Sequence, residues 1–410
     1  MLKLHRIHGG LRLDGHKAES LQRGLQQASL PERLFLPLRQ HIGDPDKPVV
    51  KVGDRVLQGQ VIAAGSSPIC AAVHAPTSGK ISAIESHRVA HPSGQPDTCI
   101  VIDVDGEDQA LEPDIIDPDS LAPEALIERI RGAGIVGLGG AAFPTSPKLL
   151  RGKAHGIETL IVNGVECEPY ITCDDTLMRY RAAEVVRGSG YLQQILSPRT
   201  TYICIEDNKP EAIAAMKQAL VQHPLPDTEI VSIPTIYPSG GEKQLIQILT
   251  GKEVPHGQLA FDIGFLSQNV GTCAAITQAF EKGRPLISRV VTLTGDNITQ
   301  PGNWEVRLGT PISHLIELAG GYRHEAGQLV MGGSMMGFAL SGSDVPIVKG
   351  SNCILVMREE TIPKATGYHD ECIRCGKCTE VCPARLLPQQ LYWHARAQAY
   401  ERTQEFHLFD

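Results

Sequence analysis

Four cysteines near the end of the chain form one compact run that strongly limits how this region can fold. The run reads Cys372-Ile-Arg-Cys375-Gly-Lys-Cys378-Thr-Glu-Val-Cys382-Pro. Its C-x2-C-x2-C-x3-C-P spacing is typical of bacterial [4Fe–4S] proteins, in which closely spaced thiolates wrap one cubane. Gly376 permits turns that a Cβ would obstruct. Zinc sites usually pair two separate C-x2-C knuckles. The run therefore predicts an iron–sulfur cluster and electron transfer.

The fourth cysteine leaves two arrangements open. In two-cluster ferredoxins, the last cysteine of each run ligates the other cluster. Cys382 would then need a second run, and the sequence contains none before its last residue, Asp410. Either one cluster takes all four thiolates, or a second run follows residue 410.

Length and composition narrow the class of protein. A chain of 410 residues that is 42% hydrophobic can bury several cores, which favours two to four domains. A net charge of −8 and only two Trp argue against nucleic-acid binding. The other seven of the eleven cysteines are scattered, as expected in a reducing cytosol. No run of apolar residues is long enough to span a membrane, so we expect no transmembrane segment.

The N-terminal part predicts a β-module. Short alternating runs with Gly and Pro fill the segment from 31 to 105. The segments 52–54 and 76–79 look like the paired hairpins of a barrel-sandwich hybrid, the lipoyl type of domain. No lysine lies at the tip between them, which favours docking over a swinging arm. Eight of the seventeen residues from 103 to 119 are acidic and none is basic, which predicts a solvated linker.

The rest of the chain predicts three further modules. Alternating helices and strands predict an α/β domain with a parallel sheet, through strands 159–163 and 201–205 and helices 123–133, 210–222 and 242–250. Strands 289–294 and 328–332 around a helix at 311–319 predict a small β-grasp module. The cluster domain follows from about residue 356, with a helix-like stretch at 389–404. We expect domains at 1–105, 106–284, 285–355 and 356–410.

A glycine-rich loop is the second strong signal. It comprises Gly137, Gly139 and Gly140, followed by Phe143, Pro144 and then Lys148. Glycines permit close backbone approach, and the free amides of the following helix together with a lysine favour an anion. Many tight turns look similar, so the loop alone does not establish phosphate binding.

Three more polar turns precede helices of the same α/β domain. They are Asn163 to Tyr170 with Glu166 and Glu168, Ser239 to Lys243 with Gly241 and Glu242, and Ser267 to Thr272 with Asn269. The first lies at the carboxyl end of a strand, where open α/β sheets bind ligands. Each turn by itself also fits a simple helix cap.

Together, these four turns resemble the flavin-carrying subunit of respiratory complex I, and the whole chain more closely resembles the RnfC family, whose members belong to Rnf-type ion-translocating electron transport complexes. The resemblance implies a multidomain α/β fold: a barrel-sandwich hybrid, a complex-I-like, Rossmann-type FMN domain, a β-grasp (soluble ligand-binding) domain and a helical ferredoxin-type domain. It also implies FMN, NAD(H) and two [4Fe–4S] clusters as cofactors, with the 410-residue chain ending before the second cysteine run.

The resemblance assigns roles to individual residues. Gly137, Gly139, Gly140 and Lys148 would hold the FMN phosphate and ribityl chain, and Asn163, Glu166, Gly241, Glu242, Asn269 and Thr272 would complete the pocket. Phe143 and Glu168 would meet NADH, and Cys372, Cys375, Cys378 and Cys382 would bind metal. No catalytic side chain is implied, because the cofactors carry the chemistry.

Three residues depart from the complex-I pattern. Leu138 replaces an arginine, Lys243 a second glutamate, and Arg151 an aromatic residue that would clamp adenine. The presence of Lys243 in place of an acid reverses a local charge and favours binding of a phosphate over a ribose hydroxyl. We therefore expect NAD to bind in an altered pose.

The function implied is that of a peripheral subunit on the cytoplasmic face of a bacterial inner membrane. It would exchange electrons between NAD(H) and, through other subunits of the complex, ferredoxin. The alternatives are a diaphorase subunit of a soluble hydrogenase or formate dehydrogenase, and a non-catalytic electron-relay adaptor.

Overall fold

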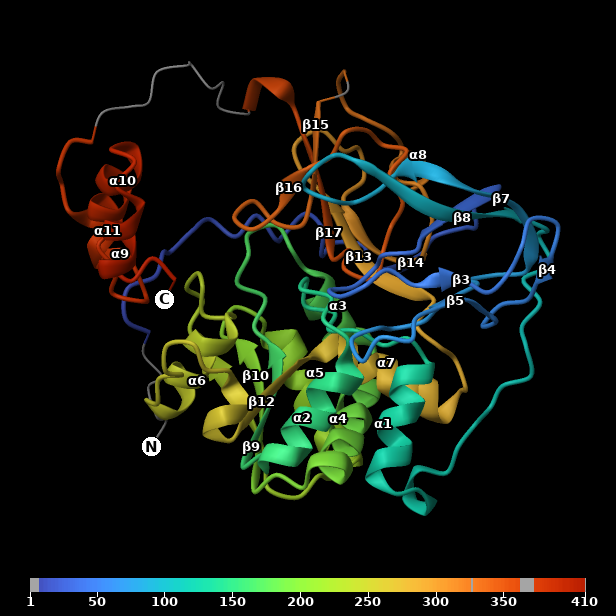
Figure 1. Cartoon of the computed structure of the whole chain (residues 1–410), viewed down its shortest axis with the longest axis horizontal. Coiled ribbons are helices and arrows are strands. Elements are labelled where there is room, and N and C mark those ends of the chain that lie inside the picture. Colours follow the sequence, from blue (N-terminus) through green and yellow to red (C-terminus); the bar gives the residue numbers. More distant parts are fainter. Residues whose placement is uncertain (1–6, 326, 362–371, 410) are drawn as a thin grey trace.

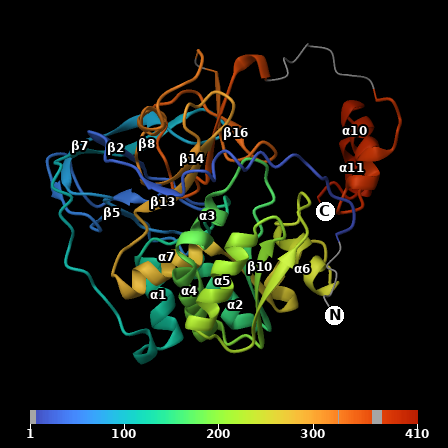
Figure 2. The same ribbon diagram turned by 180° about the vertical axis from the view of Figure 1, so that it is seen from behind.

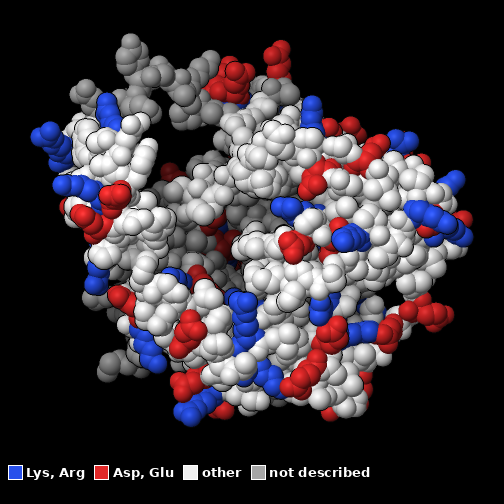
Figure 3. All heavy atoms as spheres, in the orientation of Figure 1, with Lys and Arg blue, Asp and Glu red and all other residues white. Residues whose placement is uncertain are grey.

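A computed structural model describes residues 7–325, 327–361 and 372–409. Residues 1–6 of the first expected domain and 362–371 of the fourth lie outside the described residues. Figure 1 shows an α/β domain in the lower half, β-rich domains above it and a small helical domain at one side. On the face shown in Figure 3, acidic and basic side chains are interspersed. In the described part of the chain, no helix is long and apolar enough to cross a membrane.

The N-terminal β-module forms two small sheets, ordered β2-β8-β7-β4 and β3-β5-β6. The strands are β2 (Arg33–Pro37), β3 (Lys47–Pro48), β4 (Arg55–Val56), β5 (Val61–Ala64), β6 (Val73–His74), β7 (Gly79–Arg88) and β8 (Pro96–Val104). Inward-facing Leu34, Ile62 and Ile100 are fully buried. This is the expected barrel-sandwich hybrid.

The acidic segment after β8 has no regular structure until the short helix η1 (Pro118–Ser120). Its expected character as a solvated linker is only partly right. The Asp108 carboxylate accepts hydrogen bonds from Arg307 at 2.9 Å and from Gln58 and Thr77 at 2.7 Å. One carboxylate therefore bonds the linker to both the N-terminal β-module and the β-grasp domain.

The α/β domain has the predicted parallel sheet, ordered β11-β10-β9-β12. Its strands are β9 (Thr159–Gly164), β10 (Thr200–Glu206), β11 (Thr228–Ile233) and β12 (Phe265–Asn269). Its helices are α1 (Pro123–Gly132), α2 (Thr145–His155), α3 (Cys173–Tyr180), α4 (Ala182–Leu196), α5 (Pro210–Gln222), α6 (Glu242–Thr250) and α7 (Val270–Glu281), with the short η2 (Ala260–Ile263). The carboxyl ends of β9 and β12, which lead toward α3 and α7, lie side by side, since Asn163 and Asn269 are register partners.

The β-grasp domain contains α8 (Ile312–Leu318) and a sheet ordered β1-β14-β13-β17-β15-β16. Its strands are β13 (Ser288–Thr294), β14 (Gly302–Arg307), β15 (Gln328–Met331), β16 (Phe338–Ala339) and β17 (Cys353–Met357), and η3 (Glu359–Thr361) follows. The edge strand β1 (Leu25–Gln27) comes from the N-terminal segment and pairs in parallel with β14. The strand β1 was not expected from the sequence, because three residues carry no periodic signal.

The cluster domain consists of α9 (Lys377–Val381), α10 (Pro388–Arg396) and α11 (Tyr400–Glu405). The helix-like stretch expected from 389 to 404 is broken after Arg396, where Gln398 has a φ of 56°. A non-glycine residue in the left-handed region cannot continue a right-handed helix. The expectation of one helix there was wrong.

Candidate functional site

The glycine-rich loop is fixed by hydrogen bonds at both ends. The Gly137 amide donates to the Phe143 carbonyl at 2.8 Å, and the Leu138 amide donates to Thr272 Oγ1 at 3.0 Å. In the part of the chain that the structure describes, the amides of Gly139, Gly140 and Ala141 have no protein acceptor, and these residues are exposed. Free backbone amides in a glycine-rich loop suit an anion such as phosphate.

Lys148 lies in the first turn of α2, the helix that follows this loop in the chain. Its ammonium donates to Glu242 Oε1 at 2.8 Å and to the Ser267 carbonyl at 2.7 Å. An ammonium has three donors, so one remains for a ligand. Lys148 and Glu242, both sequence candidates, thus lie together and hold each other in position.

The two candidate asparagines shape the site through bonds to protein. Asn163 Nδ2 donates to the Gly240 carbonyl at 2.9 Å, which fixes the turn before α6. Asn269 Nδ2 donates to Asp174 Oδ2 at 2.6 Å, and Asn269 Oδ1 caps α7 by accepting from the Gly271 amide at 2.8 Å. The next residue in α7, Thr272, is fully buried beneath the glycine loop. These side chains therefore fix the backbone of the turn before α6 and of the start of α7.

Glu166 lies in a buried charged cluster that the sequence did not reveal. Glu166 Oε1 accepts from the Asp174 amide at 2.8 Å, and Glu166 Oε2 lies 3.8 Å from Nζ of the buried Lys209. Lys209 also pairs with Glu206 at 2.8 Å. Burial, with the Glu166 charge second, raises the pKa of Asp174 to about 7. The pair of Glu206 and Lys209 is local, three residues apart, and only tertiary contact brings it to Glu166 and Asp174.

Glu168 has a different environment from the one that the resemblance implies. Its two carboxylate oxygens accept from the backbone amides of Met335 at 3.0 Å and Met336 at 2.8 Å, in a loop of the β-grasp domain. Burial raises the pKa of Glu168, and the two amides oppose that shift. A contact between Glu168 and NADH stays a prediction, and it would compete with these two bonds.

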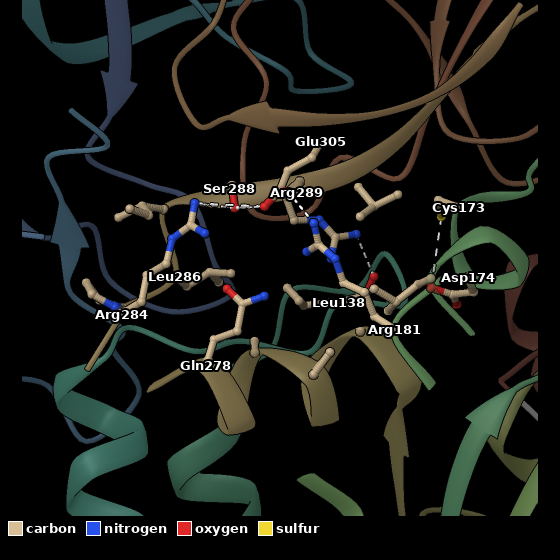
Figure 4. Close-up of a pocket in the computed structure, with 17 residues that line it drawn as sticks. Leu138, Cys173, Asp174, Arg181, Gln278, Arg284, Leu286, Ser288, Arg289 and Glu305 are labelled. Carbon is tan, nitrogen blue, oxygen red and sulfur yellow. Dashed lines mark hydrogen bonds and ion pairs between the residues drawn. The ribbon is translucent and has the colours of Figure 1, made fainter. Parts of the chain in front are cut away.

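Arg289 connects the glycine loop to the β-grasp domain. Figure 4 shows Arg289 beside a cavity of about 50 Å³ that Leu138 and Asp174 also line. Its guanidinium donates to the Leu138 carbonyl at 2.9 Å and the Ser351 carbonyl at 3.0 Å. Burial lowers the pKa of Arg289. This residue was not a sequence candidate, because an arginine within a strand usually points to solvent.

The cluster run forms an accessible loop around the start of α9. Cys372, Cys375 and Cys378 are exposed, and Cys382 is half-buried. Gly376 has a φ of 77°, so the sequence argument for a glycine at this turn is confirmed. The Leu386 amide donates to Cys382 Sγ at 3.4 Å, a contact that suits a thiolate. Four closely spaced thiols, from the exposed loop before α9 to the C-cap of that helix, fit the donor set of an iron–sulfur cluster.

Comparison with known families gives the same order of modules. Residues 5–107 match the RnfC barrel sandwich hybrid domain, and residues 130–278 match the Nuo51 FMN-binding domain. Residues 290–339 match the SLBB domain, and residues 368–386 match a 4Fe-4S binding domain.

Curated relatives match nearly the whole chain. The C subunit of the ion-translocating oxidoreductase complex from Serratia proteamaculans is 50% identical over 98% of this chain and 57% of its own length. The protein of the same name from Pseudomonas aeruginosa is 49% identical over 100% of this chain and 53% of its own length. The chain therefore spans little more than half the length of these relatives.

A solved structure supports the fold. The crystal structure of NAD+-reducing [NiFe]-hydrogenase in the H2-reduced state contains a chain with a TM-score of 0.51 and 20% identity. The match covers 60% of this chain and 48% of that chain. At this identity, the likeness shows a shared architecture.

Proposed function

Since this chain belongs to the RnfC family of ion-translocating oxidoreductase complexes, we propose that it is the flavin- and NAD(H)-binding peripheral subunit of an Rnf-type membrane complex. The complex would couple electron transfer between NAD(H) and ferredoxin to ion translocation. The subunit would bind other subunits on the cytoplasmic face of the membrane and reach ferredoxin only through them.

The glycine loop carries this proposal. Among the described residues, the amides of Gly139, Gly140 and Ala141 have no protein acceptor, and Lys148, on the helix that follows the loop, keeps one donor free of protein partners. This arrangement fits the phosphate of FMN, because helix amides and a fixed ammonium bind an anion without reorganisation. Gly241 is the N-cap of α6, and Glu242 in the first turn of that helix pairs with Lys148.

Bound FMN would supply hydride exchange with a nicotinamide and single-electron exchange with the cluster. The protein's own residues would bind and orient these cofactors. The loop amides and Lys148 would hold the phosphate, Thr272 and Arg289 would keep the loop in place, and Phe143 would meet the nucleotide. Cys372, Cys375 and Cys378 would hold one [4Fe–4S] cluster, while Cys382 would reach a second cluster in the intact protein.

Cofactor content and anaerobic reduction test the proposal. Reconstituted protein should contain one FMN and iron in cluster form, and excess NADH under anaerobic conditions should bleach the flavin absorbance. Flavin-loaded protein that NADH fails to bleach would exclude the role as NAD(H)-binding subunit. Parallel titration of wild type and Lys243→Glu with NADPH would show how Lys243 affects the choice of nucleotide.

One observation favours a non-catalytic relay as a second candidate. Glu168, which the resemblance places against NADH, is occupied by the Met335 and Met336 amides. A relay would take up iron and sulfide but retain no FMN after the excess flavin is removed. Flavin uptake with NADH bleaching would exclude it.

A further inference from the structure

The loop that carries Glu166 and Glu168 is held by a lysine far away in sequence. Lys17 Nζ donates to the backbone carbonyls of Glu166 at 2.8 Å, Glu168 at 2.8 Å and Ile171 at 2.7 Å. These three acceptors satisfy all three donors of an ammonium. Three carbonyls that converge on one point would otherwise repel each other and lack partners.

The residues beside Lys17 extend this attachment. The Tyr170 amide donates to the Gly15 carbonyl at 2.7 Å, and the His16 and Tyr170 rings stack with centroids 4.6 Å apart. His16 and Tyr170 both have positive φ, at 47° and 71°. Such backbone is unfavourable for residues other than glycine and persists only where the surroundings impose it. Each strained residue here contacts the other.

Lys17 itself is fixed by the segment around it. Figures 1 and 2 show the N-terminal segment running from beside the cluster domain across the molecule toward the β-grasp sheet. At its start, the Gly10 amide donates to the Val381 carbonyl at 2.8 Å. After Lys17, Ser20 Oγ lies 2.8 Å from Thr172 Oγ1, and the Ser20 carbonyl accepts from Asn303 at 3.0 Å.

We propose that Lys17 is a positioning residue of the flavin site. It fixes the loop from Glu166 to Ile171, called the acidic loop below, by binding three of its backbone carbonyls. Lys17 need not touch the cofactor. It sets the backbone from Glu166 to Ile171, and therefore where the Glu166 and Glu168 side chains can lie. The consequence for flavin binding rests on the proposed function, whereas the consequence for the loop does not.

The structure provides a matched control for loss of stability. Lys349 is fully buried, and its Nζ also donates to three backbone carbonyls, those of Ala71 at 3.0 Å, Ala72 at 2.7 Å and Gly134 at 2.8 Å. None of these carbonyls belongs to the acidic loop. Lys349→Ala should therefore destabilise the protein without freeing the acidic loop.

The first measurement is the FMN affinity of the full chain, determined from the change in flavin fluorescence on binding. We expect Lys17→Ala to raise the dissociation constant about tenfold or more, Lys17→Gln to raise it less, and Lys349→Ala to change it less than threefold. Propylammonium should restore affinity to Lys17→Ala, whereas tetramethylammonium, which has no N–H donor, should not. Equal FMN affinity in wild type and Lys17→Ala would overturn the flavin part of the proposal, as would equal rescue by both cations.

The second measurement is amide hydrogen exchange, which needs no flavin. The Tyr170 amide should exchange at least tenfold faster in Lys17→Ala than in wild type and should keep its protection in Lys349→Ala. Unchanged exchange at Tyr170 would overturn the proposal even if flavin affinity falls. If the protein binds no FMN, hydrogen exchange still shows whether Lys17 holds the loop in place. If Lys17→Ala does not fold, Lys17→Gln replaces it, and wild-type exchange in that variant counts against the proposal.

Discussion

Lys148 and Glu242 form an ion pair between helices α2 and α6, with 2.8 Å between Nζ and Oε1. The two residues are separated by 94 positions in the sequence. The pair is partly exposed, so it contributes little to stability by itself. Its importance lies in orientation, because it fixes the ammonium of Lys148, which lies on the helix that follows the glycine loop.

Lys148→Met should weaken FMN binding by about tenfold to a hundredfold, since a charged hydrogen bond contributes roughly 1.5–3 kcal/mol. Fluorescence titration of the apo protein would measure this loss. Lys153→Met is the matched control, because Lys153 lies on the same helix and pairs at 2.7 Å with Glu124, away from the loop. Equal weakening in both variants would show that Lys148 acts only through helix α2.

Glu168→Gln should loosen the β-grasp loop around Met335 and Met336. A glutamine can offer its one carbonyl oxygen to only one of the two amides, and it lacks the charge that strengthens both bonds. Hydrogen exchange at both amides should become faster, and Glu359→Gln, an exposed site, should leave it unchanged. If both amides stay protected in Glu168→Gln, the carboxylate does not hold the loop.

His74 should make stability depend on pH below neutrality. Burial, with the Lys349 charge second, lowers the pKa of His74 to about 3 from 6.5. The unfolded chain therefore binds more protons than the folded protein between these values, and stability falls as pH falls from 6.5 toward 3. Each pKa unit corresponds to about 1.4 kcal/mol. Melting temperatures should fall less steeply with acid in His74→Gln than in wild type or in the exposed control His91→Gln. If the melting temperatures of wild type and both variants fall equally with decreasing pH, His74 is excluded as a source of acid sensitivity.

Gly134→Ala should severely destabilise the junction of three domains. Gly134 has a φ of 65°, and a Cβ would lie 2.2 Å from the Ala72 carbonyl oxygen and 3.0 Å from Lys349 Nζ. Gly156 has a similar φ of 74° with open space around its Cβ position. Gly156→Ala should cost only about 1–2 kcal/mol for the backbone. Thermal unfolding should separate the two variants, and equal melting temperatures would mean that the junction adjusts to the added methyl group.

Cys375→Ala should abolish cluster binding, because a cubane iron needs its thiolate ligand. Iron and acid-labile sulfide after reconstitution would report the loss. Cys99→Ala is a suitable control, since Cys99 is fully buried in the hybrid domain, where burial raises its pKa to about 12. Full iron loading of Cys375→Ala would contradict the assignment of this run.

Sequence alone determined the features that are local in the chain. The cysteine spacing, the glycine at position 376 and the alternating pattern of the central domain correctly indicated the cluster run, its turn and the parallel sheet. Spacing and periodicity reflect bonds and burial within a few residues, so the chain displays them directly. The resemblance added the order of modules and the candidate residues of the site.

Only the tertiary structure decided how these parts meet. Lys17 binds carbonyls about 150 positions away, Arg289 supports a loop 151 positions away, and Glu168 binds amides that no side-chain pattern marks. The strand β1 exists because β14 supplies its partner. Such contacts depend on backbone groups and on how the chain folds back on itself. A residue type at one position does not encode which distant carbonyl or amide it will face, and only the folded arrangement fixes it.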